Sequence, residues 1–313
     1  MDPLTGLLDG PHARAAFVLR LVMASPWSVD VRDEAPLTVA AVLAGELWVT
    51  PAEGPSRLLR SGEIGLVRGP DHYRFASAPD APAEIVIHPG QRCEDIHGRR
   101  LEEPFTLGVR TWGNAPEGAT VVLIGTYEQV GETGRRLLAA LPPLLAVDGV
   151  SLDVPVVELL AAEAGRDVPG QGAVLDRLLD LLTVSVLRRW FTDAGAGAPG
   201  WWRAAADPVV GPAIRLIQHN PAHPWTVAEL AGQVGASRAA FARRFGELVG
   251  QPPMTFLTEW RLAVAADRLL EPGTTVDAVA AEVGYGSGFA LSAAFKRVRG
   301  MSPSAHRVAG VGS

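Results

Sequence analysis

The feature that most constrains the fold is an internal repeat in the last third of the chain. Residues 226–235 match residues 275–284 at an offset of 49, and the segments that follow match at an offset of 50. Ser237 then corresponds to Ser287, and the extra residue is Gly286. A repeat of this kind predicts two copies of one supersecondary unit, each packed around the same pattern of apolar positions.

The residues of the first copy predict a helix-turn-helix. Thr226 is a helix N-cap, and Glu229 follows three residues later at the spacing of a capping box. Gly235 can end the helix in the left-handed conformation, and Ser237 then caps a second helix. Phenylalanines four residues apart bury that second helix on the first (Phe241, Phe245). A continuous helix over residues 253–270 joins the two copies. Their second helices must lie about 34 Å apart to enter successive major grooves.

On these residues, the segment 209–307 resembles the DNA-binding domain of the AraC/XylS family of transcription regulators. Residues 280–285 read Ala-Ala-Glu-Val-Gly-Tyr, and residues 295–303 read Phe-Lys-Arg-Val-Arg-Gly-Met-Ser-Pro. The Gly-x-Ser-Pro ending is highly specific to that family. The resemblance implies a regulator that binds double-stranded promoter DNA, and that contacts RNA polymerase if it is an activator.

The resemblance also implies which residues read DNA. In the first copy, Arg238, Ala239, Ala242 and Arg243 face base edges, and Arg244 contacts phosphate. Arginine is the usual bidentate reader of guanine, so we expect Arg243 to make the main base-specific contact. We further expect phosphate contacts from Arg261 and Arg299.

The second copy departs from the family pattern. Relatives usually place polar residues near positions 288 and 289 and an arginine at 293, where this chain has Gly288, Phe289 and Ala293. The candidate DNA-binding residues here are Ser287, Gly288, Phe289, Ser292, Lys296 and Arg297. We therefore predict that sequence specificity lies mostly in the first copy, and that the second acts through phosphates and DNA shape.

The net charge of −6 argues against nucleic-acid binding only until it is divided along the chain. Residues 213–308 carry ten basic and seven acidic side chains, a net of +3, and the remainder carries 18 and 27, a net of −9. The modest positive charge predicts that tight DNA binding needs two protomers and depends steeply on salt.

The first half of the chain predicts a different domain. Residues 13–128 contain short apolar strands at roughly ten-residue spacing, separated by Gly, Pro and Asp, which suggests a β-sandwich or small barrel. Leucines at helical spacing follow from about residue 133, with further helices over residues 156–163 and 171–191. The broad apolar face of the last helix predicts either a homodimer interface or a cover for the sheet.

Two segments of this half are similar to the cupin-type ligand-binding domain of some AraC/XylS regulators: residues 61–69 with His72 downstream, and residues 141–145. Residues 201–208, before the first DNA-binding helix, also fit this resemblance. The expected fold is therefore α+β with two domains. A cupin-like β-barrel with trailing helices spans residues 1–191 (helical part about 133–191). A linker follows over 192–208, and an all-α domain of two helix-turn-helix units spans 209–308. The resemblance implies a small-molecule effector or a dimerising role, with Trp48, His72, Tyr73 and Trp112 as candidate effector-binding residues.

Enzymatic activity is not expected. Enzymatic cupins usually hold a metal with two histidines one residue apart, a nearby glutamate and a later histidine, whereas His72 stands alone. A separate cluster, His88, Cys93 and His97, has the spacing of zinc ligands but is also consistent with an irregular polar loop. The cofactor expectation is therefore none, or zinc at this cluster. Because Cys93 is the only cysteine, an intrachain disulfide is excluded.

The first residues lack the basic flank and apolar run of a signal peptide, and no stretch approaches twenty uncharged apolar residues. We therefore expect a cytoplasmic protein without a membrane segment. Two alternatives remain open. One is a metal-dependent cupin enzyme fused to a DNA-binding module, and the other is a ligand-free regulator controlled by a protein partner.

Overall fold

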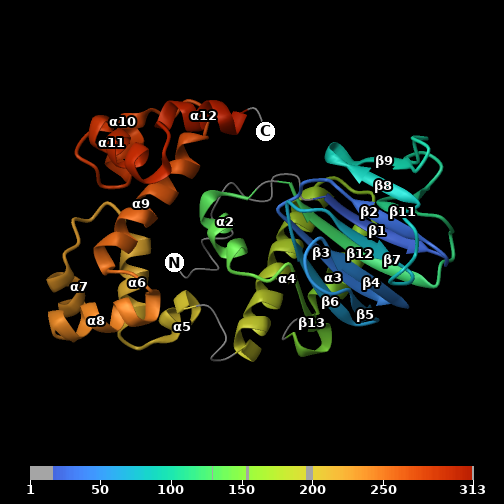
Figure 1. The fold of residues 1–313 in the computed structure, drawn as a ribbon, viewed down its shortest axis with the longest axis horizontal. Coiled ribbons are helices and arrows are strands. Elements are labelled where there is room, and N and C mark those ends of the chain that lie inside the picture. The colour runs from blue at the N-terminus through green and yellow to red at the C-terminus, as the bar shows by residue number, and fades with distance from the viewer. Residues whose placement is uncertain (1–16, 129, 153–154, 195–199, 312–313) are drawn as a thin grey trace. The chain divides into compact units, whose positions relative to one another are not determined.

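The computed structural model describes residues 17–128, 130–152, 155–194 and 200–311 (Figure 1). The described residues form two compact units, a β-rich one within 17–128 and 138–194 and a helical one that includes residues 131–137 and 200–311. The division after Ala194 falls inside the linker predicted at 192–208, of which residues 195–199 lie outside the described residues.

The strands of the β-rich unit form two sheets within the described residues. One has seven strands in the order β10-β11-β1-β12-β3-β6-β13, and the other has six in the order β5-β4-β7-β2-β8-β9. The strands are β1 (Phe17–Met23), β2 (Ser28–Val31), β3 (Leu37–Ala44), β4 (Glu46–Pro51), β5 (Arg57–Arg60), β6 (Glu63–Arg68), β7 (Tyr73–Ala76), β8 (Ile85–His88), β9 (Arg92–Asp95), β10 (Thr106–Gly108), β11 (Thr111–Gly113), β12 (Thr120–Tyr127) and β13 (Leu144–Asp148).

Gly45 is the point at which the chain passes from one sheet to the other. It separates β3 from β4, has a φ of +73°, and lies so close to the Ala119 carbonyl oxygen that a Cβ would be 2.3 Å from it. Only glycine fits such a turn without strain. The single apolar run over residues 39–49 is thus two strands of different sheets, whose inner faces share one core that includes Val42, Leu47 and Val122.

Two helices of this unit, α3 (Val156–Ala164) and α4 (Gln171–Ala194), pack on each other and on the seven-stranded sheet. Gly125 of β12 permits the closest approach, because a Cβ there would lie 2.3 Å from Leu179 of α4. One expectation was wrong in detail: the helical pattern predicted from about residue 133 does not extend to Leu144 and Leu145, which lie in β13 and pair antiparallel with β6. The proline pair before them ends the helical pattern.

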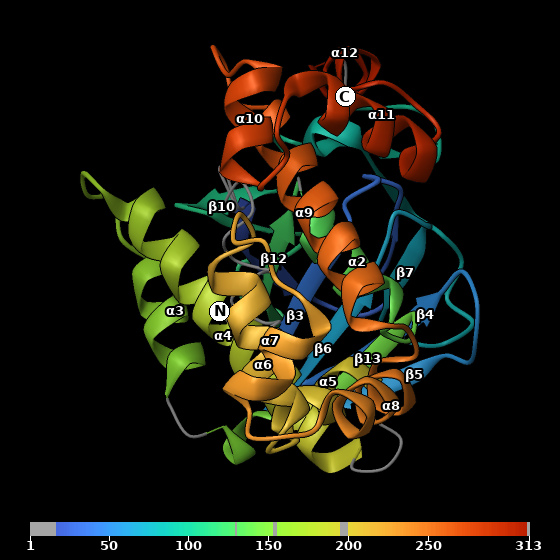
Figure 2. The same ribbon diagram turned by 90° about the vertical axis from the view of Figure 1, so that its left-hand side faces the viewer.

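The helical unit contains both copies of the repeat. In Figures 1 and 2, α9 (Pro253–Leu269) runs from the α7–α8 pair to the α10–α11 pair. Each of these two helix pairs has its own hydrophobic core. The other helices are α2 (Glu132–Ala139), whose residues 132–137 belong to this unit, α5 (Gly200–Ala206), α6 (Val210–His219), α7 (Val227–Gln233), α8 (Arg238–Val249), α10 (Val276–Glu282), α11 (Gly288–Arg299) and α12 (Pro303–Val311).

The predicted fold class is confirmed: the chain combines a β-rich domain carrying trailing helices with a helical domain of two helix-turn-helix units. None of the helices in the described ranges combines the length and apolar character needed to cross a bilayer.

Candidate DNA-binding interface and sensor pocket

The four helix starts of the repeat are capped as its sequence predicts. The side-chain oxygens of Thr226 and Thr275 accept backbone N–H groups at 3.1 and 3.2 Å, and those of Ser237 and Ser287 do so at 3.3 and 3.2 Å. The second half of the capping box, a bond from the Glu229 side chain back to the start of the helix, is replaced. The Glu229 carboxylate lies 2.7 Å from His223 Nε2. Each cap satisfies one of the N–H groups that a helix leaves free at its start.

The turn between the helices is also alike in the two copies. Gly235 and Gly284 have φ values of +67° and +81°, the left-handed conformation that glycine adopts without strain. Inside each copy the second helix buries its apolar face completely, through Phe241 and Phe245 in α8 and Leu291 and Phe295 in α11. The inner faces therefore fix the second helices in the same way, and the outer faces are free to differ.

The outer face of α8 carries the arginines predicted to read DNA. Arg238, Ala239 and Arg243 are exposed, and Ala242 is half-buried between them. The Arg243 side chain is 73% exposed, and its ion pair with Glu247 is long at 3.9 Å. A guanidinium held this loosely can leave its partner for a base edge at small cost.

Arg244, expected to contact phosphate, is instead committed within the domain. Its guanidinium donates to both carboxylate oxygens of Asp207, at 3.0 Å from Nε and 2.5 Å from Nη2. The same carboxylate accepts the N–H groups of Val209 and Val210 at the start of α6. The Arg244 hydrogen bonds lower the pKa of Asp207 to about 2. Arg244 thus fastens α8 to the start of α6.

The outer face of α11 is smaller and more apolar. Ser287, Phe289, Ala293, Lys296 and Arg297 are exposed, and Ser292 is half-buried. Gly288, by contrast, is buried, and the reason lies in α10. The Asp277 carboxylate accepts the Gly288 N–H at 2.8 Å, and a Cβ on residue 288 would lie 2.6 Å from that carboxylate.

Sequence reasoning missed Asp277, although the repeat held a signal. Asp277 stands where the first copy has Ala228, a polar residue replacing an apolar one at a matched position. It caps the start of α11 and keeps residue 288 small, which removes one DNA-facing side chain from the second copy.

Two further arginines expected at phosphates lie in internal contacts. Arg261 donates to the carbonyl oxygens of Pro221 and His223 at 2.6 and 2.9 Å, and burial lowers the pKa of its guanidinium. Arg299, at the end of α11, forms an ion pair with Glu132 of α2 and is 16% exposed. Both side chains therefore have protein acceptors within the domain, and their contact with phosphate stays a prediction.

The β-rich unit contains an apolar pocket of about 40 Å³ between its two sheets. The two predicted residues that reach it are Tyr73 and Trp112, and its polar members include Asp33 and Gln91. The Tyr73 hydroxyl donates to Thr38 Oγ1 at 2.8 Å, whereas Trp112 Nε1 is buried and has no hydrogen-bond partner among the described residues. Burial raises the pKa of the Asp33 carboxyl.

The other two predicted effector residues lie elsewhere. His72 is exposed in the loop before β7, and Trp48 points away from the core because its strand neighbours Leu47 and Val49 are the buried ones. No local signal marks Asp33 or Gln91 as pocket residues, since the pairing of strands distant in sequence brings them there.

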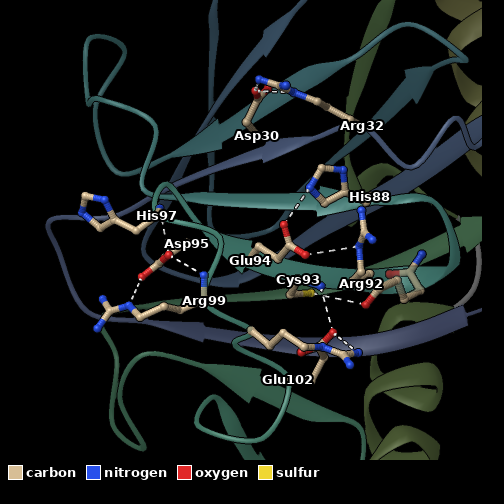
Figure 3. Close-up of polar contacts among 12 residues, drawn as sticks. Asp30, Arg32, His88, Arg92, Cys93, Glu94, Asp95, His97, Arg99 and Glu102 are labelled. Atoms are coloured by element: carbon tan, nitrogen blue, oxygen red, sulfur yellow. Dashed lines mark hydrogen bonds and ion pairs between the residues drawn. The ribbon is translucent and has the colours of Figure 1, made fainter.

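The predicted zinc ligands are not brought together (Figure 3). His88 pairs with Glu94 at 3.5 Å, Cys93 points into the core, and His97 lies at a turn where its N–H donates to Asp95 at 2.8 Å. Burial, followed by the charge of Glu102, raises the pKa of the Cys93 thiol to about 11. Over the residues that the structure describes, no three His, Cys, Asp or Glu side chains lie close enough to hold a metal.

Comparisons with known families agree with this division of the chain. A family model described as cupin matches residues 2–192, and a model described as helix-turn-helix domain matches residues 230–309.

Similar proteins over nearly the whole chain include AraC-like transcription regulators of Streptomyces lividans (33% identical) and Streptomyces antibioticus (31%), each covering 98% of both chains. The transcriptional regulator AlkR of Acinetobacter baylyi is 26% identical over 98% of this chain and 99% of its own. A solved structure, the DNA-binding domain of AdpA with a target DNA, is 36% identical over 33% of this chain and 92% of its own, with a TM-score of 0.31.

The relatives that match this chain over nearly their whole length are described as transcriptional regulators, and the cupin and helix-turn-helix models both match this chain. The chain therefore belongs to the AraC family of DNA-binding transcriptional regulators, in the group with a cupin-type N-terminal domain.

Proposed function

We propose that this regulator recognises its operator mainly through α8, with Arg243 as the principal base-reading residue. The observation that carries this is the contrast at one repeat position: Arg243 is exposed and loosely paired, whereas its counterpart Ala293 ends at a methyl group. Because the second helix of a helix-turn-helix lies in the major groove, an arginine there can bond guanine O6 and N7.

The remaining exposed residues divide by chemistry. Arg238 adds a second long donor at the start of α8, and Ala239 and Ala242 leave room for the groove. On α11, Lys296 and Arg297 are exposed cations suited to phosphate, which positions the protein without specifying sequence. Ser292 is the remaining short hydrogen-bonding side chain, since Ser287 already caps its helix.

The test begins with duplexes selected from a random pool by the full-length protein. Arg243→Ala should lower affinity for the selected site about tenfold to a hundredfold and relax base preference at one position. Ser292→Ala should change affinity less than threefold, which is below about 1 kcal/mol. Arg215→Ala, which removes an exposed arginine of α6, is the matched control. A larger loss of specificity in Ser292→Ala than in Arg243→Ala contradicts the proposal.

For the cupin-type half we propose binding of a small, mainly apolar effector at the pocket of Tyr73 and Trp112, with no enzymatic activity. The pocket is lined by strands of both sheets, so an effector bound there would contact both sheets at once. Ligand binding would shift the balance between two protein conformations in which those contacts differ. Affinity for the selected duplex, measured across a metabolite panel, tests the idea. An effect that persists in Trp112→Ala would place the effector elsewhere.

We also propose that the protein acts as a homodimer through α3 and α4. Val174 and Leu181, two turns apart on α4, are 45% and 42% exposed, and Leu159 of α3 is 52% exposed. Exposed apolar side chains gathered on neighbouring helices are typical of association surfaces. Leu181→Asp should convert a dimer to monomers in light scattering, with Arg60→Asp, an exposed residue of β5 outside both helices, as control. A wild-type monomer at micromolar concentration contradicts this part.

A further inference from the structure

Phe289 is the second residue of α11, and 86% of its surface is exposed. A single exposed aromatic residue is ordinary on a protein surface, so exposure alone indicates nothing. Its position is the informative feature. The first residues of the second helix of a helix-turn-helix lie nearest to base edges, and the repeat places Phe289 where the first copy has Ala239.

The neighbours of Phe289 on this end of α11 are all shorter than the phenyl ring. Gly288 has no side chain and cannot gain one without meeting Asp277. Ala290 and Ala293 end at a methyl group, and the Ser287 hydroxyl accepts the Ala290 N–H. Over described residues 287–293, Phe289 is therefore the one exposed side chain long enough to enter a groove from this end of α11.

A phenyl ring has no hydrogen-bonding group, so it can discriminate only by apolar contact. In the major groove the apolar group that distinguishes one base is the C5-methyl of thymine. We propose that Phe289 reads a thymine methyl in the half-site under α11. This inference rests on the proposed function, in which both second helices enter the major groove. It assigns the second unit an apolar readout instead of a guanine contact.

The test removes the methyl group and nothing else. In the duplex selected by the full-length protein, each thymine of the half-site under α11 is replaced in turn by 2′-deoxyuridine, which keeps every pairing atom. Wild type should lose about fourfold in affinity at one or two positions, the value for one buried methyl group. Phe289→Ala should bind the thymine and uracil duplexes equally, and Phe289→Leu should keep part of the difference.

Val298→Ala is the matched control, because Val298 is an exposed apolar residue at the far end of α11, 43% exposed. It should keep the full thymine preference. Hydrogen exchange across α11 confirms that each variant is folded.

The outcomes separate clearly. A half-site in which no uracil substitution weakens wild type, or a loss that persists in Phe289→Ala, contradicts the inference and leaves the proposed function standing. Unchanged DNA affinity in Phe289→Ala, with reduced transcription by added polymerase, would assign the ring to a protein contact and also overturn it. A pool that yields no preferred sequence contradicts the proposed function and the inference together.

Discussion

The two helix-turn-helix units share an inner face and differ on the outer one. Matched caps, left-handed glycines and buried phenyl or leucyl side chains recur in both. On the outside, the position that holds Arg243 in the first unit holds Ala293 in the second, and the position that holds Ala239 in the first holds Phe289 in the second. Folding and DNA reading therefore use opposite sides of the same helix, which lets one unit change its reading residues without losing its structure.

The outer faces differ in kind as well as in size. The first offers long hydrogen-bond donors near its start, and the second offers one apolar ring and short side chains there, with its long cations Lys296 and Arg297 toward its end. Asp277 contributes to this difference from the neighbouring helix, because it occupies the space that a side chain at residue 288 would need. The local sequence of α11 alone gives no reason for that glycine.

The largest expected effect tests the claim that the inner faces are equivalent. Phe245→Ala and Phe295→Ala each remove a fully buried ring, and each should destabilise its own unit by about 3–5 kcal/mol. Hydrogen exchange resolved for α8 and α11 measures the two losses separately. Exposed Ala239→Ser and Ala293→Ser are the controls. A loss in one unit below half of that in the other would end the equivalence.

The next prediction concerns a contact that only the first unit has, between Arg244 and Asp207. Asp207→Asn should cost about 1–2 kcal/mol near pH 7, because one partner is half-exposed and partly screened. The pKa of Asp207 is lowered to about 2 from 3.8, so this stability is complete above about pH 4 and is lost as the pH falls toward 2.

Urea unfolding of wild type and Asp207→Asn from pH 7 to pH 2 measures this difference. The two curves should converge at the acid end, whereas the exposed control Arg243→Ala should stay parallel to wild type. A gap between wild type and Asp207→Asn that is constant with pH would show that the ion pair contributes nothing.

A smaller effect is expected at the matched caps. Thr226→Ala and Thr275→Ala each remove one side-chain acceptor of a helix N–H, which typically costs about 1 kcal/mol. Exchange protection of α7 and α10 should fall by similar factors, with Thr255→Ala on the exposed side of α9 as the control. Unequal losses would indicate that the His223–Glu229 contact supports the first cap in a way the second lacks.

The smallest effect should come from Gly288→Ala. The added methyl group must displace the Asp277 carboxylate and break its hydrogen bond to residue 288, for a net cost of at most about 1 kcal/mol. In an Asp277→Ala background the same substitution should cost nothing, because the carboxylate that the methyl group would meet is gone. A cost that persists in the double variant would remove Asp277 as the cause.

Much of the helical domain is predictable from sequence, because its signals are local. Caps, left-handed glycines and apolar spacing act over three to seven residues, and the repeat states them twice. The strands of the other half were recognisable as strands. The apolar run over residues 39–49, however, did not show that the chain changes sheet at Gly45, and the leucine spacing did not show that Leu144 lies in a strand. The sheet to which a strand belongs depends on partner strands that are distant in sequence, and the periodicity of one segment carries no information about those partners.

Sequence by itself determined that this chain carries two helix-turn-helix units and that Arg243 and Phe289 face outward, since both follow from short-range capping and helical periodicity. Only the tertiary structure decided the partners of the charged and polar side chains. It pairs Arg244 with Asp207, 37 residues earlier in the chain, and it places the Cys93 side chain in the core, away from His97. It also placed Asp33 beside Tyr73 in one pocket. Such pairings join segments far apart in sequence, so packing and register choose them and spacing along the chain does not.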